Sequence, residues 1–242
     1  TESGNATLAT ANIAYDAGGV TVTAGRFGTP IGYEVLEPWG NDHVSRSYNW
    51  GAQPISHDGL TISTAIGGAD VTLGAVNNLS VNDASNDADD EMGIIAAIGT
   101  SVGDWDVSLS GIVTEDGDAT GNDHTIANLI LSGELAGMPL SIEVTDSEDE
   151  DVAAGTTEDF RSVSVYTGTS VGSADLALRL EFVDDITVGS TETEVWSVTA
   201  TASWALADGV DFRLEYRHDE ADDAVFNDDT SGGDDALDIV QA

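Results

Sequence analysis

The segment EVWSVTATASWAL, residues 194–206, alternates apolar and polar side chains with a period of two. Successive side chains of a β-strand point to opposite faces, so this period predicts a strand whose two faces differ. The apolar face carries Trp196, Val198, Ala200, Ala202 and Trp204. The opposite face carries Ser197, Thr199, Thr201 and Ser203. One face is therefore hydrophobic and the other is covered by small hydroxyl groups.

The spacing of the two tryptophans suits a strand that crosses a bilayer. At ~3.3 Å per residue and a tilt of ~40°, eight residues separate them by about 20 Å along the membrane normal, close to the ~25 Å apolar band between aromatic girdles. We expect the girdles to consist of Trp105, Trp196, Trp204, Phe182, Phe212 and Tyr216. A soluble β-sandwich, with the Trp196 to Trp204 face buried against a second sheet, remains the alternative.

The connections between such segments alternate between short and long along the chain. The short ones lie at residues 16–19, 67–69, 102–104, 135–138, 169–173 and 207–209, and most contain the Gly that tight hairpins need. The long ones lie at residues 28–58, 78–91, 115–123, 146–159, 184–193 and 220–235, and hold the densest acidic blocks. This alternation predicts an all-β fold, an up-and-down antiparallel transmembrane β-barrel of about 12 to 14 strands, with short periplasmic turns and long acidic extracellular loops.

The ends of the chain belong to the same prediction. Twelve segments can be traced between residues 6 and 220, and residues 236–242 begin a thirteenth. We expect residues 1–242 to form one barrel domain that lacks an N-terminal strand and the end of its C-terminal strand, fourteen strands in total, in the outer membrane of a bacterium.

Composition excludes several classes of protein. The formal net charge is −39, from 45 acidic residues against six Lys and Arg, which excludes nucleic-acid binding. No apolar run approaches the ~18 residues of a spanning helix. With no Cys, disulfides and thiolate metal sites are impossible. The acidity has two open explanations: it serves the function, or it reflects a saline habitat in which salt screens self-repulsion.

Charged residues on the polar faces of the strands are candidates for the pore lining, because rings of charge set the selectivity of pores. The candidates are Asp106, Glu143, Asp175, Arg179, Glu181, Asp211, Arg213, Glu215 and Arg217. Acids outnumber arginines in this set, which favours cations. The alternative is that part of the set forms ion pairs within the wall, since unpaired buried charge is costly.

Residues 25–63 contain four recognisable elements: Gly25-Arg26-Phe27, Thr29-Pro30-Ile31-Gly32, Ser45-Arg46-Ser47 before Trp50, and His57-Asp58-Gly59 at the start of a strand. With these elements the stretch resembles the β-barrel porin family of the OmpL-like type. The resemblance covers about a sixth of the chain and implies an outer-membrane barrel with porin function. The rest of the chain is unusually acidic and short for the family.

The same stretch contains the longest connection, and loops this long are uncommon unless they are functional. We expect it to fold into or across the lumen as a constriction loop that includes Arg26, Glu34, Glu37 and Arg46, with both arginines facing acidic wall residues. The alternative is a folded cap outside the rim.

Neither a catalytic nor a metal site is predicted. The four His form no H-E-x-x-H motif, and there is no G-x-S-x-G elbow. The acidic runs match no EF-hand, so Ca²⁺ at the acidic loops is only a secondary possibility and no cofactor is expected. The expected partners are the lipid bilayer and small ions or polar solutes, with homo-oligomerisation left open. The competing function is a structural or adhesive surface protein with acidic, cation-binding loops.

Overall fold

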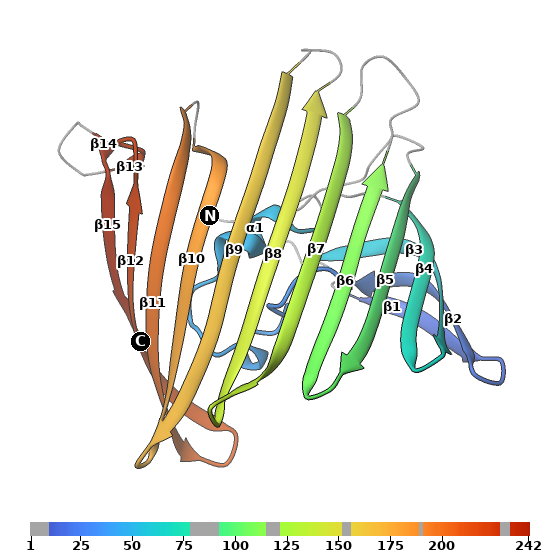
Figure 1. The fold of residues 1–242 in the computed structure, drawn as a ribbon, viewed down its shortest axis with the longest axis horizontal. Helices are drawn as coiled ribbons and strands as arrows, with labels where there is room; N and C mark the ends of the chain where they lie inside the picture. The colour runs from blue at the N-terminus through green and yellow to red at the C-terminus, as the bar shows by residue number, and fades with distance from the viewer. Residues whose placement is uncertain (1–9, 78–91, 115–121, 152–155, 189–190, 228–232) are drawn as a thin grey trace, which may run out of the picture.

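The computed structural model describes residues 10–77, 92–114, 122–151, 156–188, 191–227 and 233–242. Most of these residues lie in β-strands (Figure 1). The helical elements are a 3₁₀ turn, η1 (Pro38–Gly40), and one short helix, α1 (Tyr48–Ala52). In the described ranges, no helix is both long enough and apolar enough to cross a membrane.

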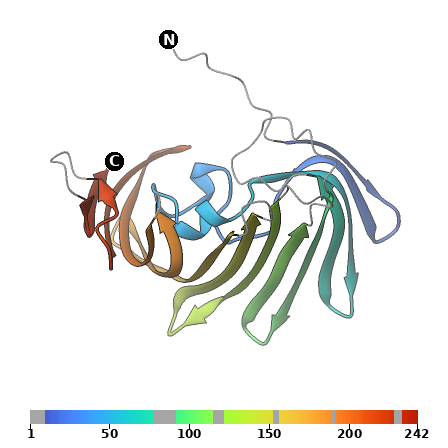
Figure 2. The same ribbon diagram turned by 90° about the horizontal axis from the view of Figure 1, so that it is seen from above.

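Thirteen of the described strands form one antiparallel sheet, in which they pair in the order in which they follow one another along the chain. They are β1 (Ala11–Asp16), β2 (Val20–Gly28), β3 (Ser56–Ile66), β4 (Ala69–Asn77), β5 (Met92–Val102), β6 (Trp105–Thr114), β7 (Asn122–Leu135), β8 (Met138–Asp151), β9 (Thr156–Val171), β10 (Ala174–Val188), β11 (Thr191–Ala207), β12 (Val210–Ala221) and β15 (Ala236–Gln241). β13 (Phe226–Asn227) and β14 (Gly233–Asp234) form a separate small hairpin. The predicted up-and-down topology is confirmed, and the sheet curves into the wall of a barrel in which β1 and β15 are the two edges (Figure 2).

All six predicted short connections are tight hairpins at one end of the sheet. In the turn between β3 and β4, Gly67 and Gly68 have φ values of 61° and 91°, a region that favours residues without a Cβ. Strands extend into several of the predicted long loops, and the predicted limits are furthest off in two of them. Residues 146–151 continue β8, and residues 184–188 continue β10, because the backbone ladder between paired strands persists whichever side chains it carries.

The two faces of the sheet differ as the alternation predicts. Outward-facing Leu176, Leu180 and Leu214 are 40–45% exposed, whereas inward-facing Arg179, Glu181 and Glu215 on the same strands are buried. Trp196 lies opposite Phe182, and Trp204 lies opposite Phe212 with ring centroids 5.8 Å apart. These two aromatic pairs mark two levels on the outer face, eight residues apart on β11.

The concave interior of the sheet holds the connection between β2 and β3, which Figure 2 shows inside the curve with η1 and α1. We call residues 29–55 the inner loop. An interior position requires the wall to satisfy the polar groups of the loop backbone, since buried N–H groups without partners are costly. The inner loop and the wall behind it therefore define the candidate site.

Candidate functional site

Three glutamates on the inner face, Glu143, Glu181 and Glu215, accept hydrogen bonds from backbone N–H groups of the inner loop. They lie on the alternate strands β8, β10 and β12 and are 1–4% exposed. The donors are Tyr33 N to Glu143 at 2.9 Å, Tyr48 N to Glu181 at 2.8 Å, and Val44 N and Ser45 N to Glu215 at 2.6 and 2.9 Å. Charged acceptors make stronger hydrogen bonds than neutral ones. We call these three residues the glutamate belt, and it attaches the loop to the wall.

Arg179 on β10 is the cationic centre of this attachment. It is fully buried, and its guanidinium forms ion pairs with Glu181 at 2.7 Å and with Glu34 of the loop at 2.8 Å. It also donates to the backbone carbonyls of Ser45 and Arg46. Burial raises the pKa of the Glu34 carboxyl, although Arg179 opposes this shift. Arg179 therefore compensates two buried carboxylates, and its removal would leave both without their main counter-ion.

The other arginines near the loop are also engaged. Arg217 pairs with Asp219 at 2.7 Å and donates to the Arg46 carbonyl at 2.6 Å. Arg213 donates to the Asn41 carbonyl at 2.6 Å. Arg46 was expected to face an acidic wall, and this is wrong. It folds back over the Trp50 ring at 4.0 Å and donates to carbonyls of the loop itself.

His43 of the loop is buried against β11 and β12. The Thr201 hydroxyl donates to Glu215 at 2.7 Å, so it accepts from the His43 Nδ1–H at 2.8 Å. Burial, with Arg179 nearby, lowers the pKa of His43 to about 4, against the opposing attraction of Glu215. His43 is thus neutral at pH 7, with its proton on Nδ1.

Hydroxyl and amide groups on the wall complete the attachment, and the sequence prediction did not single them out. Asn128 and Tyr166 both donate to Glu143 at 2.9 Å. Asn49 of α1 donates to Ser164 on β9 at 3.0 Å. The run of inward-facing Ser and Thr was visible in the sequence, but it carried no information about which loop would lie against it.

The opposite side of the interior holds the loop through apolar contact. Ile31 of the loop, 1% exposed, belongs to a buried cluster with inward-facing side chains from five strands. These are Phe27, Val76, Ile95, Ile112 and Ile126. At these positions the inner face is apolar instead of polar. This interruption is visible in the sequence and could have predicted a buried apolar contact inside the barrel.

Four aspartates occupy the short-turn end of the inner face. Asp70, Asp106, Asp175 and Asp211 are each the second residue of the strand that follows a short turn, on β4, β6, β10 and β12. We call them the aspartate ring. All four are exposed, and the ion pairs of the described residues include none of them. Three were predicted, and Asp70 was missed although it occupies the same position after its turn.

The ring aspartates of two hairpins are oriented by the same local motif. The sequence Ser-Val-Gly-x-x-Asp occurs at residues 101–106 and 170–175. In both copies the serine hydroxyl donates to the aspartate across the hairpin at 2.6 Å, from Ser101 to Asp106 and from Ser170 to Asp175. The serine orients the carboxylate, and the carboxylate remains exposed to the interior.

Two further residues of the predicted constriction loop lie elsewhere. Arg26 is in β2 and pairs with Asp58 on the outer face, opposite in direction to the buried Phe27. The expectation that it faces the lumen is wrong, because β2 extends to Gly28 and its alternation places residue 26 outward. Glu37 is exposed at the start of η1, where its carbonyl accepts from Asn41.

The predicted girdle residues all fall on the outer face. Phe182, Trp196, Phe212 and Tyr216 are 41–49% exposed, and Trp204 is half-buried. Trp105 is also half-buried and lies against Gly133. An exposed aromatic band at two levels matches the outer surface of a membrane barrel.

The described residues contain no group of three or more His, Asp or Glu side chains that could hold a metal ion. Residues 83–91 and much of the acidic run at 115–123 lie outside the described residues. The possibility of Ca²⁺ binding at those loops stays a prediction.

An up-and-down sheet with an apolar outer face, a polar inner face and a loop folded inward defines a porin-type barrel. A sequence model of the family described as "Putative beta-barrel porin-2, OmpL-like" matches residues 2–241. The chain belongs to this family of bacterial outer-membrane porins. No curated protein sequence shows significant similarity to the chain.

Solved porins share the fold at low sequence identity. OmpT of Vibrio cholerae is 12% identical with a TM-score of 0.63, over 87% of this chain and 69% of its own. The anion-selective porin from Comamonas acidovorans is 14% identical with a TM-score of 0.63, over 88% and 67%. The outer-membrane protein OpdK from Pseudomonas aeruginosa is 12% identical with a TM-score of 0.55, over 91% and 66%. These identities establish the fold alone.

Proposed function

We propose that this porin is a passive, cation-preferring pore for ions and small polar solutes, with the aspartate ring as its selective element. The observation that carries the proposal is the different state of the two sets of inward-facing acids. The glutamate belt is buried and occupied by the inner loop, whereas the ring is exposed and outside every ion pair of the described residues. Rings of exposed carboxylates favour cations in pores.

The positions of the arginines also support a preference for cations. The chain has six Lys and Arg in all. Arg26 and Arg161 pair with Asp58 and Asp146 on the outer face. The other four hold the inner loop, as described above. The short-turn end of the interior therefore carries a local excess of negative charge, which attracts cations within about one Debye length, ~8 Å at physiological salt.

Fold likeness does not determine this preference, since the Comamonas acidovorans relative is anion-selective. The preference must therefore come from the charged side chains that line the pore. Diffusion through a hydrated lumen requires no cofactor, because it involves no chemical step.

The test is single-channel recording of the full chain in planar bilayers, with the reversal potential measured under a KCl gradient. We expect ohmic steps and a reversal potential on the cation side. The quadruple variant Asp70→Asn, Asp106→Asn, Asp175→Asn and Asp211→Asn should conduct with the preference reduced or lost. An unchanged reversal potential would contradict the role of the ring.

Reproducible insertion without conductance would contradict the pore itself. It would favour an adhesive or structural barrel whose lumen is blocked by the inner loop. The many hydrogen bonds between this loop and the wall are the observation that favours this second candidate. Heat-modifiable migration on gels would confirm that the inserted variants are folded.

A further inference from the structure

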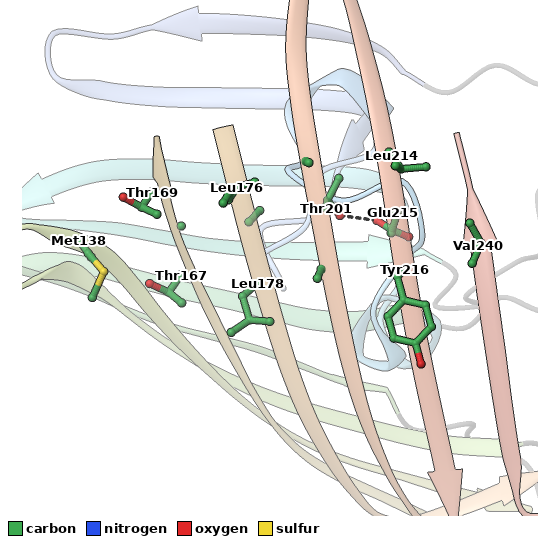
Figure 3. Close-up of a pocket in the computed structure, with 14 residues that line it drawn as sticks. Met138, Thr167, Thr169, Leu176, Leu178, Thr201, Leu214, Glu215, Tyr216 and Val240 are labelled. Carbon is green, nitrogen blue, oxygen red and sulfur yellow. Dashed lines mark hydrogen bonds between the residues drawn. The ribbon is translucent and has the colours of Figure 1, made fainter. Parts of the chain in front are cut away.

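The outer face carries an apolar groove of about 510 Å³ across β9 to β12 (Figure 3). Its floor is formed by Ala200 and Ala202 of β11, which are flanked by larger side chains. Leu176 and Leu178 stand on one side, and Leu214 and Tyr216 stand on the other. The groove follows from the register, because the two alanines lie directly between these pairs in the sheet.

The groove lies between the two aromatic levels, nearer the short-turn one. On β11, Ala202 and Ala200 lie two and four residues from Trp204, on the side away from the short turn. Met138, Thr167 and Thr169 extend the lining toward the short turns. In outer-membrane barrels the short turns are periplasmic, so the groove opens into the periplasmic leaflet of the bilayer.

Larger and polar side chains lie beyond the end of the groove that is farther from the short turns. The floor rises from Ala200 to Val198, and the Tyr216 hydroxyl donates to Asp238 of β15 at 2.7 Å. Asp238 also bonds His218, at 2.8 Å. We therefore expect an apolar occupant to lie on the short-turn side of this polar cluster.

We propose that the groove binds one acyl chain of a phospholipid from the periplasmic leaflet, with the headgroup at the short-turn rim. β10 and β12 lie two strand spacings apart, about 10 Å, so their side chains leave room between them for a single hydrocarbon chain. Each methylene placed against the alanine floor gains contact with side chains on both sides.

The shape of the groove favours a lipid over a second copy of the chain. A symmetric interface uses the same patch on both copies and requires that patch to be self-complementary, whereas two concave grooves facing each other leave a void. The occupant that matches both width and location is a lipid tail.

The test fills the groove with a bulky side chain and compares it with a matched control. Ala200→Trp places an indole on the groove floor. Ala127→Trp places the same group on an exposed, outward-facing position of β7 outside the groove. The delipidated full chain is titrated in detergent with palmitoyl-oleoyl phosphatidylethanolamine and followed by native mass spectrometry.

We expect the wild-type chain and Ala127→Trp to retain one lipid, and Ala200→Trp to retain it about tenfold less, since filling the floor removes the contacts of the chain. Glycerophosphoethanolamine, the headgroup without tails, should not compete. Equal lipid retention by both variants would overturn the proposal. Dimers or trimers of the wild type that only Ala200→Trp abolishes would overturn it in favour of an interface between copies.

Folding and pore function are checked separately. The residue at position 200 points outward, and the Thr201 to Glu215 hydrogen bond drawn in Figure 3 lies on the inner side of the same strands. Ala200→Trp should therefore keep the single-channel conductance of the wild type. If Ala200→Trp loses the lipid but keeps its conductance, the result supports lipid binding in the groove. If the wild-type chain binds lipid but does not conduct, the lipid proposal holds and the proposed pore function fails.

Discussion

The glutamate belt and the aspartate ring are two sets of carboxylates on the same inner face, with opposite surroundings. Glu143, Glu181 and Glu215 are buried under the inner loop and accept its backbone N–H groups. The ring aspartates, one residue into their strands, are exposed. The belt is a structural attachment, and the ring is available to ions.

The difference teaches that alternation assigns a residue to a face, whereas its height along the strand assigns its role. A carboxylate at the level of the loop is desolvated and needs N–H donors or an arginine. A carboxylate at the mouth keeps its water and its charge. The charge of the lumen therefore cannot be obtained by counting inward-facing residues.

Arg179→Ala should have the largest effect, because it leaves Glu34 and Glu181 buried without their shared cation. Removing one partner of a buried pair costs about 3–5 kcal/mol. We expect a lower unfolding temperature and larger, noisier conductance steps as the loop detaches. Thermal unfolding and single-channel recording measure the two effects.

The control for this variant is Arg161→Ala, at an exposed pair with Asp146 on the outer face. It should change stability by less than about 1 kcal/mol, since exposed pairs contribute little. Equal effects of the two substitutions would show that the belt does not hold the loop.

Ile31→Ala tests the apolar attachment on the other side of the interior. Truncating a buried isoleucine costs about 2–5 kcal/mol, with the cost rising with the cavity left behind. We expect destabilisation and increased current noise without a change in reversal potential, because no charge is altered. Chemical denaturation measures the first effect, and a shift in selectivity would contradict the separation of attachment from charge.

Acid should weaken the attachment through His43. Its pKa is lowered to about 4 in the folded chain, against 6.5 ordinarily, so the unfolded chain binds a proton first as pH falls. The folded state loses stability between pH 6.5 and 4, by at most about 3 kcal/mol, and is insensitive to this group above pH 7.

The groups facing His43 are Glu215, which favours its protonation, and Arg179, Arg213 and Arg217, which oppose it. Thermal unfolding of wild type and His43→Gln across this pH range isolates its contribution from that of Glu34. If the unfolding temperatures of the two chains changed with pH in parallel, His43 would not contribute to the loss of stability in acid.

The sequence was sufficient for the fold because the signals that define it are local. Alternation over residues 194–206 and the Gly-containing turns locate strands, faces and connections without knowledge of their partners. The limits of β8 and β10 were missed because backbone pairing continues into acidic segments, and side-chain composition does not report where a ladder ends.

For the candidate site, the sequence predicts on which face of the sheet each residue lies, but not what the residue contacts there. All nine predicted lining residues lie on the inner face, yet Glu181 and Asp175 cannot be distinguished by sequence, since both follow the same period on β10. Their difference depends on the path of the inner loop, a tertiary contact between segments more than a hundred residues apart. Arg26 was grouped with the constriction loop although the predicted connection begins at residue 28. It lies in β2, where the alternation places its side chain on the outer face.

The most direct test compares the accessibility of the two levels from the pore. The chain has no Cys, so single cysteines can be introduced without background. Asp175→Cys samples the ring. Ser164→Cys is nearly isosteric and lies directly opposite Glu181 at the level of the belt. A cationic methanethiosulfonate reagent is added during single-channel recording. We expect stepwise loss of cation current at Asp175→Cys and no reaction at Ser164→Cys. Equal reactivity at both positions, or no change in current at Asp175→Cys, would contradict an open aspartate mouth below a loop-covered belt.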